Sequence, residues 1–172
     1  MKNIPHLNLN DFLSGNLKTK NEFIKQLGKG FSEIGFIAIK GHLLDDRTKD
    51  ALYTEVRSFF NLSDKVKSKY IIKGLASQRG FTPFGKESAK GKNIGDLKEF
   101  WHVGRDLPED HRLKDQFPNN IWPKEVEGFK DTFQAMFKAL DDTGRIMLEA
   151  LTYSLDVPKD YFQKMTEAGS SI

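Results

Sequence analysis

The 172-residue chain carries 27 basic and 24 acidic side chains, a net charge of +3, and no cysteine. The near balance of charge argues against a polyanion-binding surface, and the lack of cysteine excludes thiol catalysis, disulfides and zinc–cysteine sites. The opening residues have no apolar signal segment and no run approaches the length of a membrane span. We therefore expect one cytoplasmic domain without a membrane partner.

The first part of the chain predicts a strand, a helix and a second strand. Residues 4–9 alternate apolar and polar side chains, which suits a short strand. Either Thr19 or Asn21 can cap a helix with one apolar stripe. Gly35 ends this helix, and residues 36–39 have the character of a buried strand.

The middle of the chain predicts two helices and then a long irregular segment. Asp45 can cap the first helix, and Ser63 starts the second, which is short. Segment 79–105 is too long for a tight turn, and its aromatic residues argue against disorder. Loops of this length are uncommon and are often functional, so we look for function here and expect a strand at 97–103.

The last part of the chain predicts a long helix. Residues 108–123 form a second irregular stretch, bounded by prolines. From Lys124 to about Leu155 the apolar residues keep helical spacing, which at 1.5 Å per residue gives roughly 48 Å. Such a helix suits a larger body than one small core. A final short helix opens at Pro158 and fades over residues 169–172.

No complete active site can be assembled from these residues. None of the four histidines, His6, His42, His102 and His111, has the spacing of a metal-ligand motif. The glycines of segment 79–105 lack the strand–loop–helix context of a phosphate cradle. The lysines at 65–73 and 86–92 are loosely grouped, which favours solvated surface and ranks nucleic-acid binding behind the other functions.

Five blocks follow one another along the chain. They are residues 4–9, 35–42 (GFIAIKGH), 59–67 (FFNLSDKVK), 79–87 (RGFTPFGKE) with 96–100 (DLKEF), and 120–123 (NIWP). Together they resemble the N-terminal region of isopenicillin N synthase-like iron(II)/2-oxoglutarate-dependent oxygenases. The resemblance implies an α+β fold for residues 1–172, helix-rich, with a few short strands and a long C-terminal helix. In the intact family this region packs on a double-stranded β-helix (jelly roll), which is missing here.

The resemblance also implies an oxidoreductase. Family members are dioxygenases that use Fe(II) and 2-oxoglutarate on a small-molecule substrate, with a His-x-Asp…His iron triad and an Arg-x-Ser pair for 2-oxoglutarate. This sequence has neither motif, so no catalytic or metal residue is carried over. We expect the chain alone to be inactive and to bind neither cofactor. The family's long loop helps form the mouth of the pocket, which makes Arg79, Phe81, Phe100 and His102 candidate substrate-side residues.

Structural roles for these four residues stay open. The two phenylalanines can be packing residues, and His102 can be structural or exposed. Arg79 can pair with Glu87, with Glu99 or with a backbone carbonyl. For the whole chain, the alternative function is a non-catalytic binding or dimerisation module derived from the family. The faces of the long helix favour self-association or docking to a catalytic half.

Overall fold

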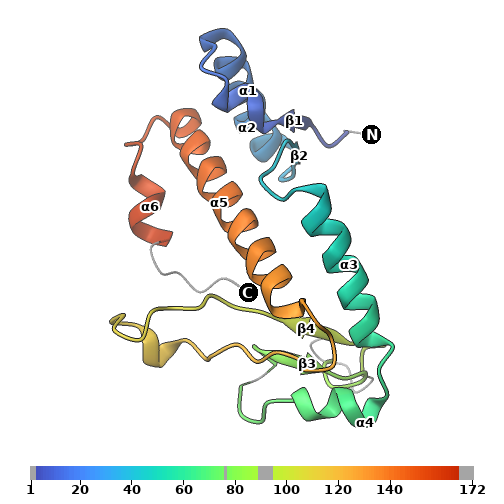
Figure 1. The fold of residues 1–172 in the computed structure, drawn as a ribbon. Helices are drawn as coiled ribbons and strands as arrows, with labels where there is room; N and C mark the ends of the chain where they lie inside the picture. Colours follow the sequence, from blue (N-terminus) through green and yellow to red (C-terminus); the bar gives the residue numbers. More distant parts are fainter. Residues whose placement is uncertain (1–2, 76, 89–94, 167–172) are drawn as a thin grey trace. The chain divides into compact units, whose positions relative to one another are not determined.

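The computed structural model describes residues 3–75, 77–88 and 95–166 (Figure 1). They form two compact units, one made of the chain up to Asp45 and from Lys138 on, the other of Asp46–Phe137. Both units mix helices with short strands, so the predicted α+β class is confirmed. Within these ranges no helix is long and apolar enough to cross a membrane. Lys90 and Lys92, which were predicted to be solvated, lie outside the described residues. So does the predicted helix end at 169–172.

The first unit is built around a short parallel strand pair. Its elements are β1 (His6–Asn8), α1 (Leu9–Leu13), α2 (Leu17–Glu33), β2 (Ala38–Lys40), most of α5 (Phe129–Leu155), and α6 (Tyr161–Thr166). The two strands pair with Leu7 opposite Ile39. Their buried side chains form one apolar cluster with α1, α2 and α5, made of Leu7, Leu9, Phe12, Phe23, Leu27 and Ala150.

Two helix starts differ from the sequence prediction. Helix α2 is capped by Asn16, whose side chain accepts hydrogen bonds from the amides of Lys18 and Thr19, so the predicted cap was wrong by about one turn. Helix α5 begins at Phe129 and not at residue 124. The reason is Gly128, whose φ of 81° lies in the left-handed region and cannot continue a right-handed helix. The predicted end of α5, at residue 155, is confirmed.

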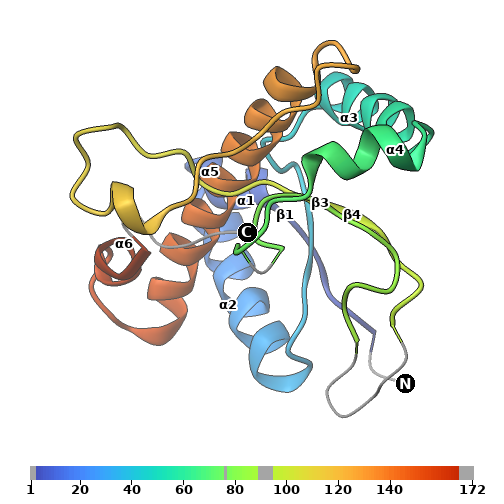
Figure 2. The same cartoon turned by 90° about the horizontal axis from the view of Figure 1, so that it is seen from below.

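The second unit combines an antiparallel strand pair with several helical segments (Figure 2). Its elements are α3 (Asp46–Phe60), α4 (Asp64–Lys67), η1 (Ser68–Tyr70), β3 (Gly80–Thr82), β4 (Phe100–His102), η2 (Lys114–Gln116) and the first turns of α5. Strand β4 falls inside the strand predicted at 97–103. Its partner β3 was not predicted, so the described residues of segment 79–105 contain a strand pair and not simply a long loop.

Ring contacts around one residue make the core of this unit. The ring of Phe59 is fully buried, and five aromatic rings lie within about 6 Å of it, those of Phe60, Tyr70, Phe81, Trp101 and Phe129. Most of these pairs are edge-to-face or tilted, which are the arrangements that aromatic pairs favour. Helices α3 and α5 and both strands therefore share one aromatic cluster.

The first residue of β3 must be glycine. Gly80 has a φ of 72°, and a Cβ there would lie 2.5 Å from the Tyr70 carbonyl oxygen and 2.8 Å from the Ile121 side chain. We expect Gly80→Ala to lower the free energy of unfolding by about 3 kcal/mol, because it adds a backbone clash to an unfavourable φ. Chemical denaturation measures this change. Gly74→Ala is the matched control, since Gly74 has a φ of 87° but open space around it; an equal loss in both variants would contradict the clash.

Candidate functional site: the outer face of the β3–β4 pair

The register of β3 and β4 sorts the candidate residues onto two faces. Gly80 lies opposite His102, Phe81 opposite Trp101, and Thr82 opposite Phe100. Because successive side chains of a strand point to opposite faces, Phe81 and Trp101 share one face. Both contact the ring of Phe59, so this is the core face. Phe100 and His102 share the other face, called here the outer face.

The outer face places an aromatic ring beside an imidazole. The ring centres of Phe100 and His102 are 4.6 Å apart, and both side chains are half-buried. The Nδ1 atom of His102 lies 2.5 Å from the carbonyl oxygen of Ser77. Thr82, directly opposite Phe100, is almost fully buried, and its hydroxyl has no partner among the described residues. Of the four candidate residues, the structure brings Phe100 and His102 together as one surface.

The other two candidates, Phe81 and Arg79, are buried. Phe81 is buried in the aromatic cluster, which agrees with the packing role that the sequence left open. Arg79 is also buried: its Nε donates to the Pro118 carbonyl at 3.2 Å and its guanidinium donates to the Gln78 carbonyl at 2.6 Å. Burial lowers the pKa of Arg79, and the charge of Asp106 partly offsets this. Of the alternatives for Arg79, the structure selects the backbone carbonyls.

An asparagine ties the chain after β4 to the NIWP block. The Asn120 side chain accepts a hydrogen bond from the Gly104 amide at 2.9 Å and donates to the Gly104 carbonyl at 2.8 Å. It therefore satisfies both backbone groups of one residue, as a neighbouring strand would. Gly104 also packs closely on the guanidinium of Arg79. Arg79, Gly104 and Asn120 thus form one support at the end of β4, with Arg79 and Gly104 buried and Asn120 half-buried.

A buried ion pair joins α4 to the residue before β4. The Lys67 ammonium lies 2.8 Å from Glu99 and 3.2 Å from Asp64, with side-chain exposures of 6% for Lys67 and 15% for Glu99. It also lies 5.5 Å from the ring centre of Phe81. Burial lowers the pKa of Lys67, but the hydrogen bonds and charges of Glu99 and Asp64 together raise it more, so the pKa is above its ordinary value. The sequence-based assignment of this lysine to solvated surface was therefore wrong.

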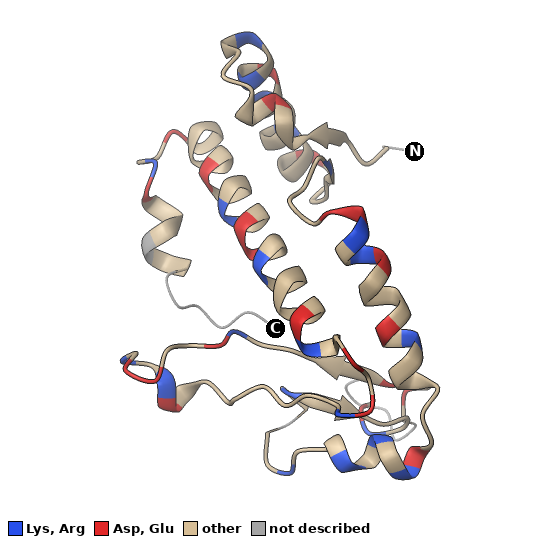
Figure 3. Ribbon diagram, viewed as in Figure 1, with Lys and Arg blue, Asp and Glu red and all other residues tan. Residues whose placement is uncertain are grey.

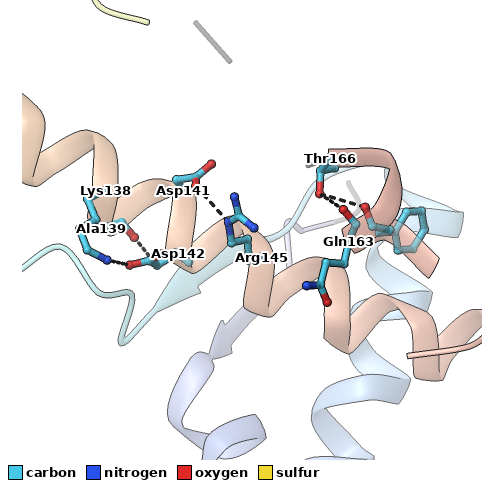
Figure 4. A network of polar contacts seen from close by, with 9 residues as sticks. Lys138, Ala139, Asp141, Asp142, Arg145, Gln163 and Thr166 are labelled. Atoms are coloured by element: carbon cyan, nitrogen blue, oxygen red, sulfur yellow. Dashed lines mark hydrogen bonds and ion pairs between the residues drawn. The ribbon is translucent and has the colours of Figure 1, made fainter. Parts of the chain in front are cut away.

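A groove in the first unit is a second place where polar residues gather. It has a volume of about 400 Å³ and lies between α5 and α6. Several of its polar side chains already have partners: Figure 4 shows Arg145, which donates to Asp141 at 3.1 Å, and Thr166, which donates to a carbonyl of its own helix. Lys159 and Glu149 pair at 3.0 Å. Because these polar side chains already have partners, the groove offers a ligand fewer free hydrogen-bonding groups than the outer face does.

Charges of both signs alternate over the helices. Figure 3 shows acidic and basic residues interleaved along α3 and α5. Among the described lysines of the loose groups, Lys69 pairs with Glu125 at 3.6 Å and Lys67 is buried. A nucleic-acid surface needs a concentrated basic face, which this pattern does not favour.

The described residues do not fit an iron centre. Iron(II) oxygenases of this type need two histidines and a carboxylate on one open site. Among residues 3–75, 77–88 and 95–166, no group of three or more histidine, aspartate or glutamate side chains could hold a metal ion.

Residues 4–125 match the family described as the N-terminal region of non-haem dioxygenases in morphine synthesis. The chain is 28% identical over 173 aligned residues to 1-aminocyclopropane-1-carboxylate oxidase of Dictyostelium mucoroides, covering 95% of this chain and 45% of that protein. It is 27% identical to a 2-oxoglutarate-dependent dioxygenase of Aspergillus niger, covering 95% and 51%. The chain thus spans about half the length of these curated relatives.

Solved structures give the same answer for the fold. A Caulobacter crescentus protein assigned to the 2OG-Fe(II) oxygenase family superimposes with a TM-score of 0.81 at 35% identity, over 95% of this chain and 52% of that one. A full-length Neurospora crassa protein, solved in complex with alpha-KG, superimposes with a TM-score of 0.79 at 24% identity, over 96% and 51%. Fe(II) and 2-oxoglutarate are the cofactors of this family. Sequence and fold together show that the chain belongs to the iron(II)/2-oxoglutarate-dependent oxygenases, as their N-terminal part.

Proposed function

We propose that the chain is the N-terminal portion of an oxidoreductase, an iron(II)/2-oxoglutarate-dependent dioxygenase acting on a small organic substrate. It supplies scaffold and one wall of the substrate pocket, while a jelly roll beyond residues 1–172 supplies the iron ligands. The observation that carries the proposal is the match of 95% of this chain to about half of each of two dioxygenases. A cytoplasmic location is part of the same proposal.

Unpaired strand edges and exposed apolar side chains in the first unit support the presence of a further domain that packs on it. Strands β1 and β2 pair only with each other among the described residues. The free edges of this pair leave room for a further strand of a larger sheet. Several large apolar side chains of α5 are also exposed, namely Leu140, Tyr153 and Leu155. These exposed apolar side chains are available to a docking partner.

The four candidate residues take two roles in this proposal. Phe100 and His102 contact the substrate, because they share the outer face and remain partly exposed. Arg79 and Phe81 act as positioning residues, because both are buried and hold the strand pair from behind. Their position near the pocket stays a prediction for the intact enzyme.

The proposal is tested by measuring whether the protein releases succinate from 2-oxoglutarate. Purified residues 1–172, given Fe(II), ascorbate and 2-oxoglutarate, are expected to release no succinate above the background of a no-protein reaction. The product of the same gene read beyond codon 172 is expected to contain a His-x-Asp motif and to release succinate. A stop codon directly after residue 172, with no separate gene for a jelly roll, would exclude the proposal.

The alternative is a non-catalytic binding or dimerisation module. The same exposed side chains of α5 favour it, since a second copy could cover them. Size-exclusion chromatography with light scattering separates the two functions: a discrete, stable dimer supports the module, whereas aggregation that a co-expressed jelly roll relieves supports the dioxygenase.

A further inference from the structure

We propose that the outer face binds an uncharged aromatic or heteroaromatic ring that carries an N–H or O–H group, with Nε2 of His102 as the hydrogen-bond acceptor. This inference rests on the proposed function, because it names the class of substrate that the same face would take. Three features of the face lead to it: the proton position on His102, the aromatic surface beside it, and the pairing of the nearby cations.

The partner of His102 fixes its tautomer. A carbonyl oxygen can only accept a hydrogen bond, so the Nδ1 atom that contacts the Ser77 carbonyl must carry the ring proton. The neutral imidazole then has a lone pair at Nε2. Nε2 has no hydrogen-bond partner among the described residues and is not one of their fully buried polar atoms. It is therefore open to a donor from outside.

The neighbouring ring provides flat apolar surface. Phe100 lies 4.6 Å from the imidazole, ring centre to ring centre, and both side chains keep part of their surface exposed. A ligand ring stacked beside Phe100 gains the usual aromatic contact. An N–H or O–H at the edge of that ring would supply the hydrogen-bond donor that Nε2 lacks among the described residues.

The cations near this face argue against recognition of a carboxylate. The ammonium of Lys98 lies over one side of the Phe100 ring, 5.3 Å from the ring centre, and is held 3.0 Å from Glu87 and 3.6 Å from Asp96. The guanidinium of Arg79 is buried against backbone carbonyls. Because Lys98 and Arg79 already have partners, neither offers a free cation to a carboxylate, which favours an uncharged ligand.

The test uses phenol, anisole and benzoate as probes on the isotope-labelled 172-residue chain. Nuclear magnetic resonance titrations follow the side chains of Phe100 and His102 under mildly alkaline conditions. We expect phenol to bind about five-fold more tightly than anisole, in which a methyl group blocks the donor, and benzoate to bind no better than anisole. His102→Phe, which keeps a ring but removes the acceptor, is expected to abolish the preference for phenol.

A second measurement needs no variant. Long-range proton–nitrogen spectra identify which imidazole nitrogen of His102 carries the proton, and we expect Nδ1. A proton on Nε2, equal binding of phenol and anisole, or tighter binding of benzoate would each overturn the inference. If the longer gene product releases succinate while the probes show no preference, the proposed function stands and this inference fails. A preference for phenol, together with a longer gene product that releases no succinate, keeps the binding face and removes the proposed oxygenase function.

Discussion

Phe59→Ala is expected to lower the free energy of unfolding by about 4 kcal/mol, among the largest effects of any single substitution in this chain. Phe59 is fully buried, and its ring contacts aromatic side chains from α3, β3, β4 and α5. Removing the ring loses these contacts and leaves a cavity that stiff neighbouring rings cannot fill. Urea denaturation followed by tryptophan fluorescence measures the change, because Trp101 is one of the contacting rings.

Phe84→Ala is the matched control for this prediction. Phe84 belongs to the same segment as Phe81 but is 57% exposed. Its loss is expected to change the free energy of unfolding by no more than about 0.5 kcal/mol. Similar losses in the two variants would mean that Phe59 is not the centre of the cluster. Phe59→Leu, which restores part of the volume, is expected to fall between wild type and Phe59→Ala.

Helices with strong periodicity could be predicted from the sequence. The apolar spacing located α3, α5 and most of α2, because helix formation and burial both follow the 3.6-residue period. The starts were harder to place. Asn16 competes with several polar residues that can cap a helix, and the left-handed φ of Gly128 depends on its surroundings as well as its residue type.

The candidate site could be predicted only in part. The sequence singled out segment 79–105, and the resemblance selected the four residues within it. Neither could assign the four residues to the core face or the outer face. That assignment depends on the pairing of β3 with β4, which joins residues about 20 positions apart. A short strand that begins with glycine and is followed by proline gives little local indication of itself. The support from Asn120, 16 residues from Gly104, is likewise a long-range contact.

The missed ion pair had one indication in the sequence. Lys67 closes the FFNLSDKVK block and Glu99 lies in the DLKEF block, so two of the five blocks carry opposite charges that the fold brings together. Each residue alone looks like ordinary surface, since lysine and glutamate are seldom buried unless paired. Only the contact between the blocks shows that they are partners.

Lys67→Met is expected to lower the free energy of unfolding by about 3 kcal/mol, because it leaves the carboxylate of Glu99 buried without its partner. Lys98→Met is the matched control: Lys98 also contacts two carboxylates, but its side chain is 52% exposed, and we expect little change. The double variant Lys67→Met/Glu99→Leu is expected to recover most of the loss, since no unpaired charge remains. A double variant as unstable as Lys67→Met would show that packing of the lysine, and not its charge, supports β4.

The pH dependence of the same pair gives an independent check. Burial lowers the pKa of Lys67, but Glu99 and Asp64 raise it more. The Lys67 ammonium therefore binds its proton more tightly in the folded protein than in the unfolded chain. The stabilisation is therefore fully present below the unfolded pKa of about 10.4 and is lost as pH rises through the folded pKa. The difference in free energy of unfolding between wild type and Lys67→Met is expected to stay constant between neutral pH and about pH 10 and to narrow above it. A difference that persists unchanged at higher pH would mean that Lys67 acts through its hydrocarbon stem over Phe81 rather than through its charge.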